Sequence, residues 1–294
     1  MIGELAGLAC AALWAVISLM MRAVSDRAAA TVVNGLRCAI AAVVLAVVLT
    51  LTGSIQHVAE LPQATIIAIV GSGVVGQAIG DATFVASAKL LGASRAMPIV
   101  GISPLLTVAL AMFLFGEQLP PLALLGAVLV VGGVYFLATP VSPFRQVRKN
   151  GGTADKRGVL LALAAAVCYS FSTLILRSGL EDVDLAAANL VRLVVATISL
   201  ASIELVHSGP HLPHGLDRRA LAIMLPAGAL SAFSSLAYMV SVFYAGAAKA
   251  SVINATAPLF TLPLALVFLH ERITRRIVVG TTLSVLGIWL VLWR

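Results

Sequence analysis

Charged residues are scarce in this chain. Only 11 % of its 294 residues are Asp, Glu, Lys or Arg, whereas 61 % are hydrophobic. Soluble globular domains carry about 25 % charged residues, because polar side chains must cover their surface. The shortage of charge therefore excludes an ordinary soluble domain, and the high apolar content excludes a disordered chain. A mean hydropathy of +1.07 indicates an integral membrane protein.

Cysteines and catalytic motifs are also scarce. The three cysteines, Cys10, Cys38 and Cys168, lie in apolar runs without a CxxC spacing, so the sequence predicts neither a disulfide framework nor a metal site. The sequence contains no GxSxG or HExxH motif, no Walker-type loop and no GxGxxG in a strand–helix context. These absences argue against an enzyme and against a pump driven by nucleotide hydrolysis. We expect no cofactor.

The excess of positive charge does not indicate a nucleic-acid partner. The chain has 19 Lys and Arg against 12 Asp and Glu, but its basic residues lie mostly in short connections between apolar runs and form no patch. Such basic connections are typical of membrane proteins, in which they accumulate on the cytoplasmic side. The expected partner is therefore the lipid bilayer.

Apolar runs long enough to cross a bilayer recur along the chain. A membrane-spanning helix needs about 20 predominantly apolar residues. We therefore expect an all-α integral membrane protein with ten transmembrane helices, placed in the inner cell membrane. The predicted runs are 3–22, 31–52, 64–90, 92–115, 121–139, 158–177, 185–207, 219–245, 247–270 and 274–293.

The two halves of the chain repeat one another at a spacing of about 155 residues. Matched Arg, Asn, Pro and Glu residues are stronger evidence of duplication than matches between Ala and Leu. The sequence predicts a first five-helix repeat at 1–140, a polar linker at 141–157 and a second five-helix repeat at 158–294. The matched pairs include Gly3 and Gly158, Asn34 and Asn189, Arg37 and Arg192, Pro104 and Pro258, Glu117 and Glu271, Gly126 and Gly280, and Gly133 and Gly287.

An odd number of spans in each half has a consequence for topology. If the first half crosses the membrane five times, the second half must start on the opposite side and run in the opposite sense. Inverted repeats of this kind are the architecture with which secondary transporters alternate access to a site near the midplane. The sequence thus favours a carrier over a channel, a receptor or a membrane enzyme.

Two groups of segments carry a family resemblance. The first is ALWAVISLMMR followed by NGLR, near the start of the second run. The second is GASRAMPIVGISPLLTVALAMFLFGEQLPPLALLGAVLVVGG, with a copy in GAAKASVINATAPLFTLPLALVFLHERITRRIVVGTTLSVLGIW. In these segments the chain resembles the EamA-type permeases of the drug/metabolite transporter superfamily. The resemblance covers nearly the whole chain and implies a ten-helix carrier that moves small metabolites, often outward.

Asp81 is the only acidic residue well inside a predicted span. An ionised carboxylate is costly in a membrane, so Asp81 should face a cavity or a partner, or be protonated. It is a candidate proton-coupling or substrate-contacting residue, with Gln77 one turn earlier on the same face. The alternative is a hydrogen-bonded packing residue near the membrane boundary. In the same run Gly76 and Gly80 form a GxxxG pattern, which predicts close helix packing, with a hinge as the alternative.

Aromatic and hydroxyl residues provide further candidates for contact with a substrate. Trp14 and Tyr169 occupy matching mid-span positions, and Ser18 and Thr173 follow one turn later. A symmetric aromatic pair suits a cavity for an aromatic or amphipathic substrate, although lipid-facing aromatics are the alternative. In the eighth run, hydroxyl groups are expected either to line the cavity or only to assist helix packing. In the ninth run, an amide is expected to bond either a substrate or the backbone carbonyls that a nearby proline leaves without a donor. These candidates are Ser231, Ser235, Tyr238 and Asn254.

Arg37 and Arg192 are matched residues, each six or seven positions into its predicted span. That depth is shallow enough for the guanidinium group to reach the membrane interface, which predicts an anchor. The alternative is a role in closing the two ends of the transport path in turn, because inverted halves would place one arginine near each face.

The matched prolines and glutamates predict local structure. Pro104 and Pro258 are expected to kink the fourth and ninth helices, since a proline inside a helix frees a carbonyl. Glu117 and Glu271 fall where one helix ends and the next begins. Each carboxylate is therefore expected to face the positive N-terminal end of the helix that follows it.

These observations predict a secondary active transporter of small metabolites. The most concrete form of the prediction is a proton-coupled exporter of amino acids or related compounds. An importer or facilitator of the same fold and a non-transporting membrane scaffold are the alternatives. Pairing of two copies as a homodimer is left open by the sequence.

Loop charge predicts the orientation of the chain. Lys and Arg are concentrated in the connections that follow odd-numbered runs, which puts those connections in the cytoplasm and both termini outside. The EamA-type relatives are commonly drawn with both termini inside. We expect alkaline phosphatase fused after Arg294 to be active and green fluorescent protein at the same site to be dark. The reverse pattern would show that loop charge does not set the topology here.

Overall fold

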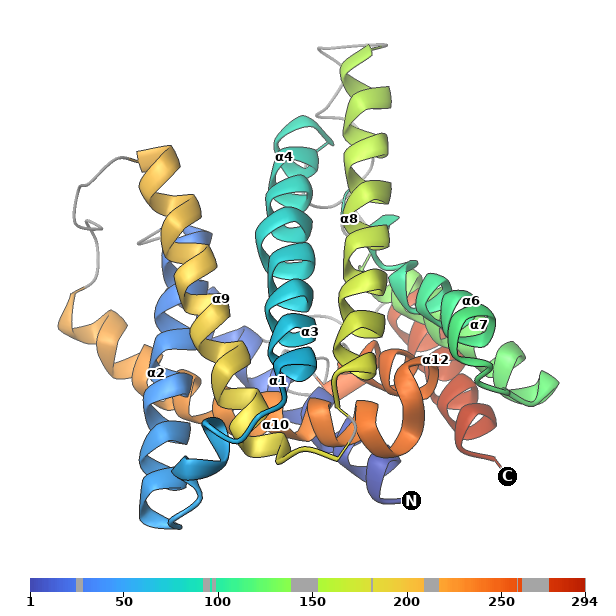
Figure 1. Ribbon diagram of the computed structural model, residues 1–294. Helices are drawn as coiled ribbons and strands as arrows, with labels where there is room; N and C mark the ends of the chain where they lie inside the picture. Colours follow the sequence, from blue (N-terminus) through green and yellow to red (C-terminus); the bar gives the residue numbers. More distant parts are fainter. Residues whose placement is uncertain are drawn as a thin grey trace.

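The computed structural model is helical in the part of the chain that it describes, and it has no β-strand there. The described residues are 1–24, 29–91, 96, 99–138, 153–180, 182–208, 217–257, 259–260 and 275–293. The elements are α1 (Ile2–Arg22), α2 (Ala30–Leu51), the short 3₁₀ helix η1 (Ile55–Val58), α3 (Gln63–Gly73), the π-helical segment η2 (Val74–Gly80), α4 (Asp81–Leu91), α6 (Ser103–Phe115), α7 (Pro121–Ala138), α8 (Thr153–Ser178), α9 (Leu185–Ser208), α10 (Arg218–Asn254) and α12 (Arg275–Leu292). In Figure 1, α6, α7 and α12 lie together at one side of the molecule, and α2 and α9 lie at the other.

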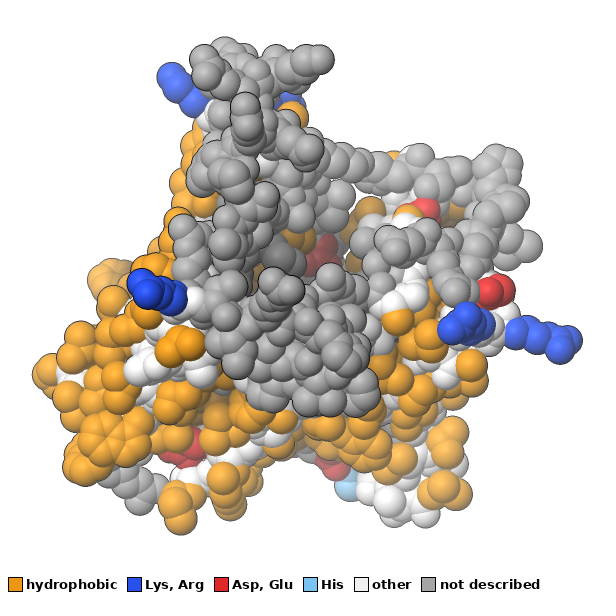
Figure 2. Space-filling model, turned by 180° about the vertical axis from the view of Figure 1, so that it is seen from behind, with side chains coloured by type: hydrophobic (Ala, Val, Ile, Leu, Met, Phe, Trp, Pro, Cys, Tyr) orange, Lys and Arg blue, Asp and Glu red, His pale blue; other side chains and the backbone are white. Residues whose placement is uncertain are grey.

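Six of the described helical stretches are long and apolar enough to cross a membrane, and three further apolar helices are shorter. Many of their large apolar side chains face outward: Phe113 is 86 % exposed and Val206 is 83 % exposed. In Figure 2 hydrophobic side chains cover much of the lower part of the surface, and Lys and Arg lie toward its edges. An apolar outer surface of this extent requires lipid around it. The protein is therefore a multi-pass membrane protein.

The helix boundaries follow the predicted runs closely in most places. The third run consists of α3, η2 and α4 in direct succession, and the eighth and ninth runs meet inside α10 at Gly246, where the backbone has φ 82° and ψ 163°. Helix α8 begins at Thr153, within the predicted linker at 141–157, so it starts before the predicted run at 158–177. The exposed Lys156 and Arg157 lie on this polar extension of α8, which projects beyond its neighbours in Figure 1.

Glycines allow helices from opposite halves to approach closely. A Cβ atom on Gly3 of α1 would lie 2.6 Å from the backbone nitrogen of Ala245 in α10. In the other half, a Cβ atom on Gly158 of α8 would lie 2.6 Å from Cγ of Leu91 in α4. These two contacts occupy equivalent positions in the sequence repeat, because Gly158 matches Gly3 and Leu91 matches Ala245. Helix α1 therefore packs on α10, and α8 packs on α4.

Close glycine contacts also join α7 and α12. A Cβ atom on Gly126 would lie 2.6 Å from the carbonyl oxygen of Gly287, and one on Gly133 would lie 2.5 Å from that of Gly280. The numbers rise along one helix while they fall along the other, so the two helices run antiparallel. Since Gly126 matches Gly280 and Gly133 matches Gly287, exchanging the halves converts one contact into the other.

Glu117 corrects one expectation. Its carboxylate accepts hydrogen bonds from the backbone N–H groups of Ala247, at 2.9 Å, and Ala248, at 3.0 Å. It therefore caps the helical segment that begins after Gly246 in the other half, not the helix α7 that follows it in the chain. Gly246 is required here because its φ is positive and because a Cβ atom would lie 2.9 Å from the Glu117 carboxylate. Glu271 lies outside the described residues.

Pro104 also differs from the expectation. Helix α6 begins at Ser103, so Pro104 occupies its first turn and does not kink a helix interior. A proline is tolerated there because the first N–H groups of a helix have no intrahelical acceptor. Its match Pro258 lies outside the described residues. A proline that does lie inside a described helix is Pro226 of α10, which the sequence analysis did not single out.

Adjacent glycines of α7 provide a test of the close packing. Alanine at Gly133 would overlap the carbonyl oxygen of Gly280 and the backbone of Ser284, whereas nothing lies within 4 Å of a Cβ atom at Gly132. We expect Gly133→Ala to destabilise the protein by about 1–3 kcal/mol. Gly132→Ala is expected to be neutral or to stabilise it by up to about 1 kcal/mol, because alanine favours the helix. Thermal unfolding in detergent measures both, and equal melting temperatures would contradict the packing.

Candidate functional site

A cavity of about 620 Å³ lies among the helices. Its walls come from both halves of the chain, with α1, α2, η2, α4, α6 and α7 from the first half and α8, α9 and α10 from the second. Hydroxyl, amide, aromatic and guanidinium groups line it together with apolar side chains. The polar and aromatic lining residues are Trp14, Arg37, Phe84, Ser103, Thr107, Tyr169, Ser172, Thr173, Arg192, Ser231, Ser234, Ser235, Tyr238, Ser251 and Asn254.

Most of the residues that the sequence singled out are brought together at this cavity. Ser18 is not, since its hydroxyl donates to the carbonyl oxygen of Ala15 at 2.8 Å and the side chain is absent from the cavity wall. The Gln77 side chain lies outside the described part of the chain. The predicted residues that line the cavity are Trp14, Arg37, Pro104, Tyr169, Thr173, Arg192, Ser231, Ser235, Tyr238 and Asn254.

Other residues that line the cavity were not predicted from the sequence. Ser103, Ser172 and Ser251 carry no repeat or charge signal, so only the fold could identify them. Thr107 matches Thr261 in the sequence repeat, and this match is the signal that could have identified it as a candidate. Cys10, which the sequence assigned no role, lines the cavity and donates from Sγ to Oδ1 of Asn254 at 3.2 Å.

Asp81 lies directly behind the cavity wall. The Tyr169 hydroxyl, which belongs to a lining residue, donates to Oδ1 of Asp81 at 2.6 Å. The π-helical segment η2 ends at Gly80, and α4 begins with Asp81. Gly80 makes the contact possible, since a Cβ atom there would lie 2.9 Å from the Tyr169 ring. Gly76 packs equally tightly against Ser172, so the GxxxG pattern serves close packing of this helix on α8.

Both arginines, predicted as interface anchors or as residues that close the transport path, line the cavity. Arg37 is 8 % exposed and lies over the Trp14 ring, 5.0 Å from its centroid. Arg192 lies over the Tyr238 ring, 5.6 Å from its centroid. Stacking of a guanidinium on an aromatic face is attractive in a site shielded from water. The matched arginines of α2 and α9 thus make the cavity electropositive.

Hydroxyl and amide groups connect the second-half helices around the cavity. The hydroxyl groups of Thr173 and Tyr238 form a hydrogen bond of 3.0 Å between α8 and α10. The Asn189 amide of α9 donates from Nδ2 to Oγ of Ser235 at 2.9 Å. The cavity can therefore offer both donors and acceptors to a small polar molecule, beside aromatic faces.

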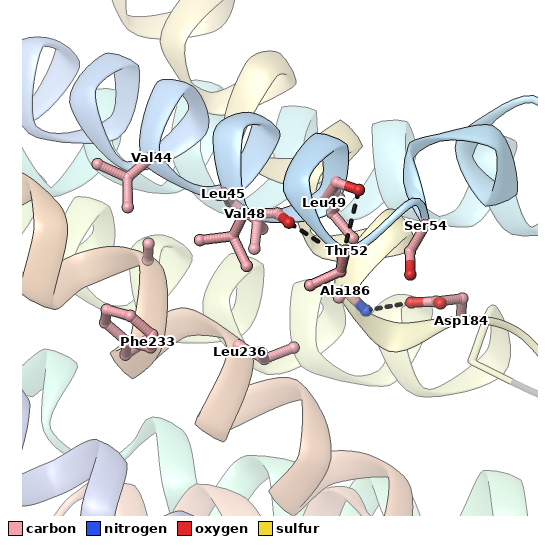
Figure 3. Close-up of a pocket in the computed structure, with 11 residues that line it drawn as sticks. Val44, Leu45, Val48, Leu49, Thr52, Ser54, Asp184, Ala186, Phe233 and Leu236 are labelled. Carbon is pink, nitrogen blue, oxygen red and sulfur yellow. Dashed lines mark hydrogen bonds between the residues drawn. The ribbon is translucent and has the colours of Figure 1, made fainter.

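A second, smaller pocket of about 250 Å³ lies between α2, the start of α9 and α10. Figure 3 shows Val44, Val48, Phe233 and Leu236 around its space, with Asp184 at one end. Its lining is mainly aliphatic and contains none of the repeat-matched polar residues. We therefore place the candidate functional site in the larger cavity.

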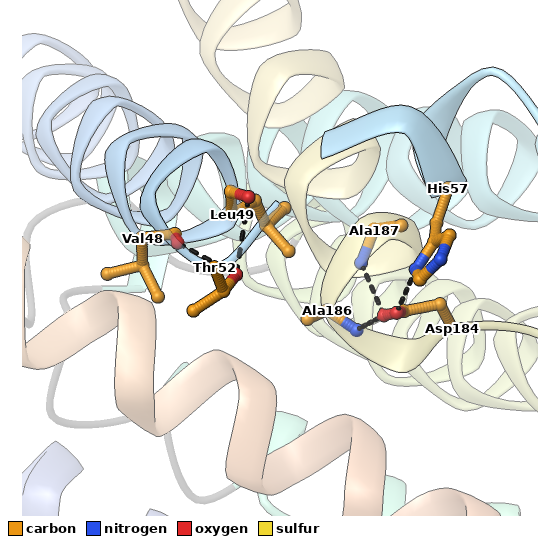
Figure 4. A network of polar contacts seen from close by, with 7 residues as sticks. All are labelled: Val48, Leu49, Thr52, His57, Asp184, Ala186 and Ala187. Carbon is orange, nitrogen blue, oxygen red and sulfur yellow. Dashed lines mark hydrogen bonds and ion pairs between the residues drawn. The ribbon is translucent and has the colours of Figure 1, made fainter. Parts of the chain in front are cut away.

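Asp184 joins the two halves at the rim of this second pocket (Figure 4). Its Oδ1 accepts hydrogen bonds from the N–H groups of Ala186, at 2.8 Å, and Ala187, at 3.0 Å, so it caps the N-terminus of α9. His57 of η1 contacts Oδ2 through Nδ1 at 2.8 Å. Partial burial acts to raise the pKa of Asp184, but the hydrogen bonds from Ala187, His57 and Ala186 outweigh burial and lower it below its usual value.

The lowered pKa of Asp184 predicts a pH dependence of stability. The ionised carboxylate stabilises the folded state above the unfolded pKa of about 3.9, and this contribution is lost as the pH falls through the lower folded pKa. We expect the melting temperature to fall less steeply between pH 5 and pH 3 in Asp184→Asn than in the wild type. At pH 7 the variant should lose no more than about 1 kcal/mol, since an amide still caps the helix.

The matched control is Asp182→Asn, because the Asp182 side chain is exposed. Thermal unfolding in detergent over this pH range is the measurement. An Asp184→Asn profile parallel to that of the wild type would show that the carboxylate is not stabilised by its partners.

Comparisons with known proteins agree with the helical membrane architecture. A family model described as "EamA-like transporter family" matches residues 1–139 and 156–293. An uncharacterized transporter of Archaeoglobus fulgidus is 25 % identical over 228 residues, which are 78 % of this chain and 76 % of that protein. An uncharacterized transporter of Clostridium kluyveri is 24 % identical over 196 residues, which are 66 % of this chain. The chain spans 62 % of the Clostridium protein, less than two thirds of its length.

One solved crystal structure superposes on nearly the whole molecule. The TM-score is 0.80, and the match covers 98 % of this chain and 94 % of that chain at 19 % sequence identity. At this identity the likeness concerns the fold alone. It supports the arrangement of the helices around the cavity without indicating what the cavity holds.

Proposed function

Since the chain belongs to the EamA-like transporter family, we propose that this transporter is a gradient-coupled secondary carrier that exports amino acids or related small metabolites in exchange for protons. Its architecture is proposed as ten transmembrane helices in two inverted five-helix repeats, located in the inner cell membrane. The observation that carries the proposal is the central cavity, which repeat-matched residues of both halves line together.

The packing between the halves supports an inverted repeat. The contacts of α1 with α10 and of α7 with α12 are each converted into an equivalent contact when the halves are exchanged, and the latter pair is antiparallel. Two equivalent halves of opposite orientation can exchange conformations, and this exchange opens a central site to one side and then to the other. A scaffold has no need of a polar cavity at the junction of its halves.

The size and chemistry of the cavity support a small polar metabolite as substrate. A volume of about 620 Å³ lies within the range of small-molecule sites. Hydroxyl and amide groups can bind the polar part of an amino acid, and the faces of Trp14, Tyr169 and Tyr238 can contact an apolar or aromatic side chain.

Asp81 and Tyr169 support coupling to protons. When Asp81 is ionised, its carboxylate can only accept, so it takes the Tyr169 hydroxyl hydrogen in the 2.6 Å bond. A protonated Asp81 can donate to Tyr169 instead, and the phenol hydrogen is then free to turn toward the cavity. Arg37 is close enough to Asp81 for their charges to attract, so protonation also changes the field in the cavity.

Asp81→Asn tests the coupling. In proteoliposomes with a panel of labelled amino acids, we expect the wild type to accumulate substrate when a pH gradient is imposed. Asp81→Asn should lose this accumulation to the level seen without a gradient but retain counterflow, because the cavity remains and only the proton site is gone. Asp182→Asn, at an exposed position, is the control. Unchanged accumulation and pH dependence in Asp81→Asn would exclude Asp81 as the coupling residue.

The same vesicles test the direction and the transporter activity itself. Inside-out membrane vesicles should accumulate substrate when their interior is acid, as expected for an exporter that exchanges substrate for protons. Accumulation in right-side-out vesicles under an inward proton gradient would instead indicate an importer. The absence of flux with amino acids, sugars and cations, at two pH values, would favour the scaffold.

A further inference from the structure

The two halves differ in how they compensate their matched arginines. Arg37 of α2 corresponds to Arg192 of α9, and each arginine lines the central cavity. The residue that corresponds to Asp81, however, is Ser235. The first half therefore has a carboxylate near its arginine, and the second half has a hydroxyl at the equivalent place.

Arg37 is compensated within its own half. Its Nε and Nη2 donate to Oδ1 of Asn34, at 3.0 and 2.7 Å. The Asp81 carboxylate is near enough to attract it. The Trp14 ring covers the guanidinium on one face. Arg37 thus has hydrogen-bond acceptors, a nearby negative charge and an aromatic contact.

Among the residues that the structure describes, Arg192 has no hydrogen-bond acceptor and no nearby negative charge. Its Nε is buried and has no hydrogen-bond partner among the described residues. The matched amide of Asn189 donates to Ser235 instead, and its Oδ1 is buried and also has no partner in the described part of the chain. Within the described part of the chain, the titratable groups near enough to influence Arg192 are Tyr238, Cys38, Cys10 and Arg37, and none of them is a carboxyl group.

A cation among membrane helices is costly without a counter-charge, particularly when a second cation lies nearby. A guanidinium group presents a planar set of N–H donors that matches the two oxygens of a carboxylate. The cavity provides the space for such a group and the neighbouring hydroxyls of Ser235 and Tyr238.

We infer that the substrate supplies the missing negative charge, and that its carboxylate binds to Arg192 between the Tyr238 ring and Ser235. The inference rests on the proposed function, since it assigns the substrate class of the same cavity. It restricts the substrates to small molecules that carry a carboxylate, either zwitterionic amino acids or simple organic acids. Amines that lack a carboxylate are not bound.

Three related probes separate these classes: phenylalanine, 3-phenylpropionate and phenylethylamine. The first two carry a carboxylate, and the first and third carry an amino group. Equilibrium dialysis with the purified, full-length protein in detergent measures binding without requiring transport. We expect phenylalanine or 3-phenylpropionate to bind and phenylethylamine not to bind. Arg192→Gln should weaken carboxylate binding by at least about tenfold, as the loss of a charge-assisted hydrogen bond does. Arg192→Lys should recover part of the affinity.

Ser235 offers a matched pair of variants. Ser235→Asp introduces a carboxylate at the position that corresponds to Asp81 in the other half, whereas Ser235→Asn has the same shape without the charge. We expect Ser235→Asp to bind the carboxylate at least about tenfold more weakly than Ser235→Asn, because the substrate must now displace an internal counter-ion. Without ligand, Ser235→Asp should melt at a higher temperature than Ser235→Asn. The two melting temperatures test whether the Arg192 charge lacks a counter-ion, even if a variant no longer binds the carboxylate.

The outcomes distinguish the substrate class from the transporter activity. Binding of neither carboxylate by the wild type, tighter binding of the amine, or equal carboxylate binding by the two Ser235 variants would overturn the inference. A lower melting temperature of Ser235→Asp than of Ser235→Asn would overturn it as well. If flux is observed only with sugars or cations, the protein is a carrier but the inferred carboxylate site is wrong. If Arg192-dependent carboxylate binding is found without flux, the inferred site is supported and the proposed carrier function is wrong.

Discussion

A cation among helices in a bilayer must be solvated by the protein itself, because lipid tails offer neither charge nor hydrogen bonds. Arg37 and Arg192 impose this requirement at the centre of the molecule. Groups from several helices meet it in part: the Asn34 amide, the Trp14 ring and the Tyr238 ring. The polar lining of the cavity provides the surroundings that these two charges need away from lipid.

Close contact between the halves makes such a centre possible. Without a hydrophobic driving force between helices in lipid, packing depends on small residues that let backbones approach. Gly3 of α1 packs against α10, and Gly158 of α8 packs against α4 at the equivalent place in the repeat. The Glu117 carboxylate adds a polar connection, since it caps the helical segment that begins after Gly246. The walls of the cavity are thus held by interactions that cross from one half to the other.

Local patterns predicted much of the fold and part of the site. Apolar length indicated the membrane helices, and repeat matching identified Trp14, Tyr169 and both arginines, which all line the cavity. The directions in which long side chains point and the partners of charged side chains were predicted less well. The anchor prediction for the arginines did not anticipate that both line a cavity, because depth in a run does not specify which way a long side chain points. Glu117 was assigned to the following helix because sequence adjacency cannot reveal a partner that lies 130 positions away.

The sequence by itself determined that this protein lies in a membrane, that it is helical and which family it belongs to, because hydropathy and repeated motifs are properties of the chain alone. Scarce charge also identified Asp81 as a residue that needs a partner. Only the tertiary structure decided that the partner is Tyr169 of the other half, and that no carboxylate of the described residues lies close to Arg192. The reason is physical: compensation of a buried charge depends on distances between helices that are far apart in the chain, and packing alone sets those distances.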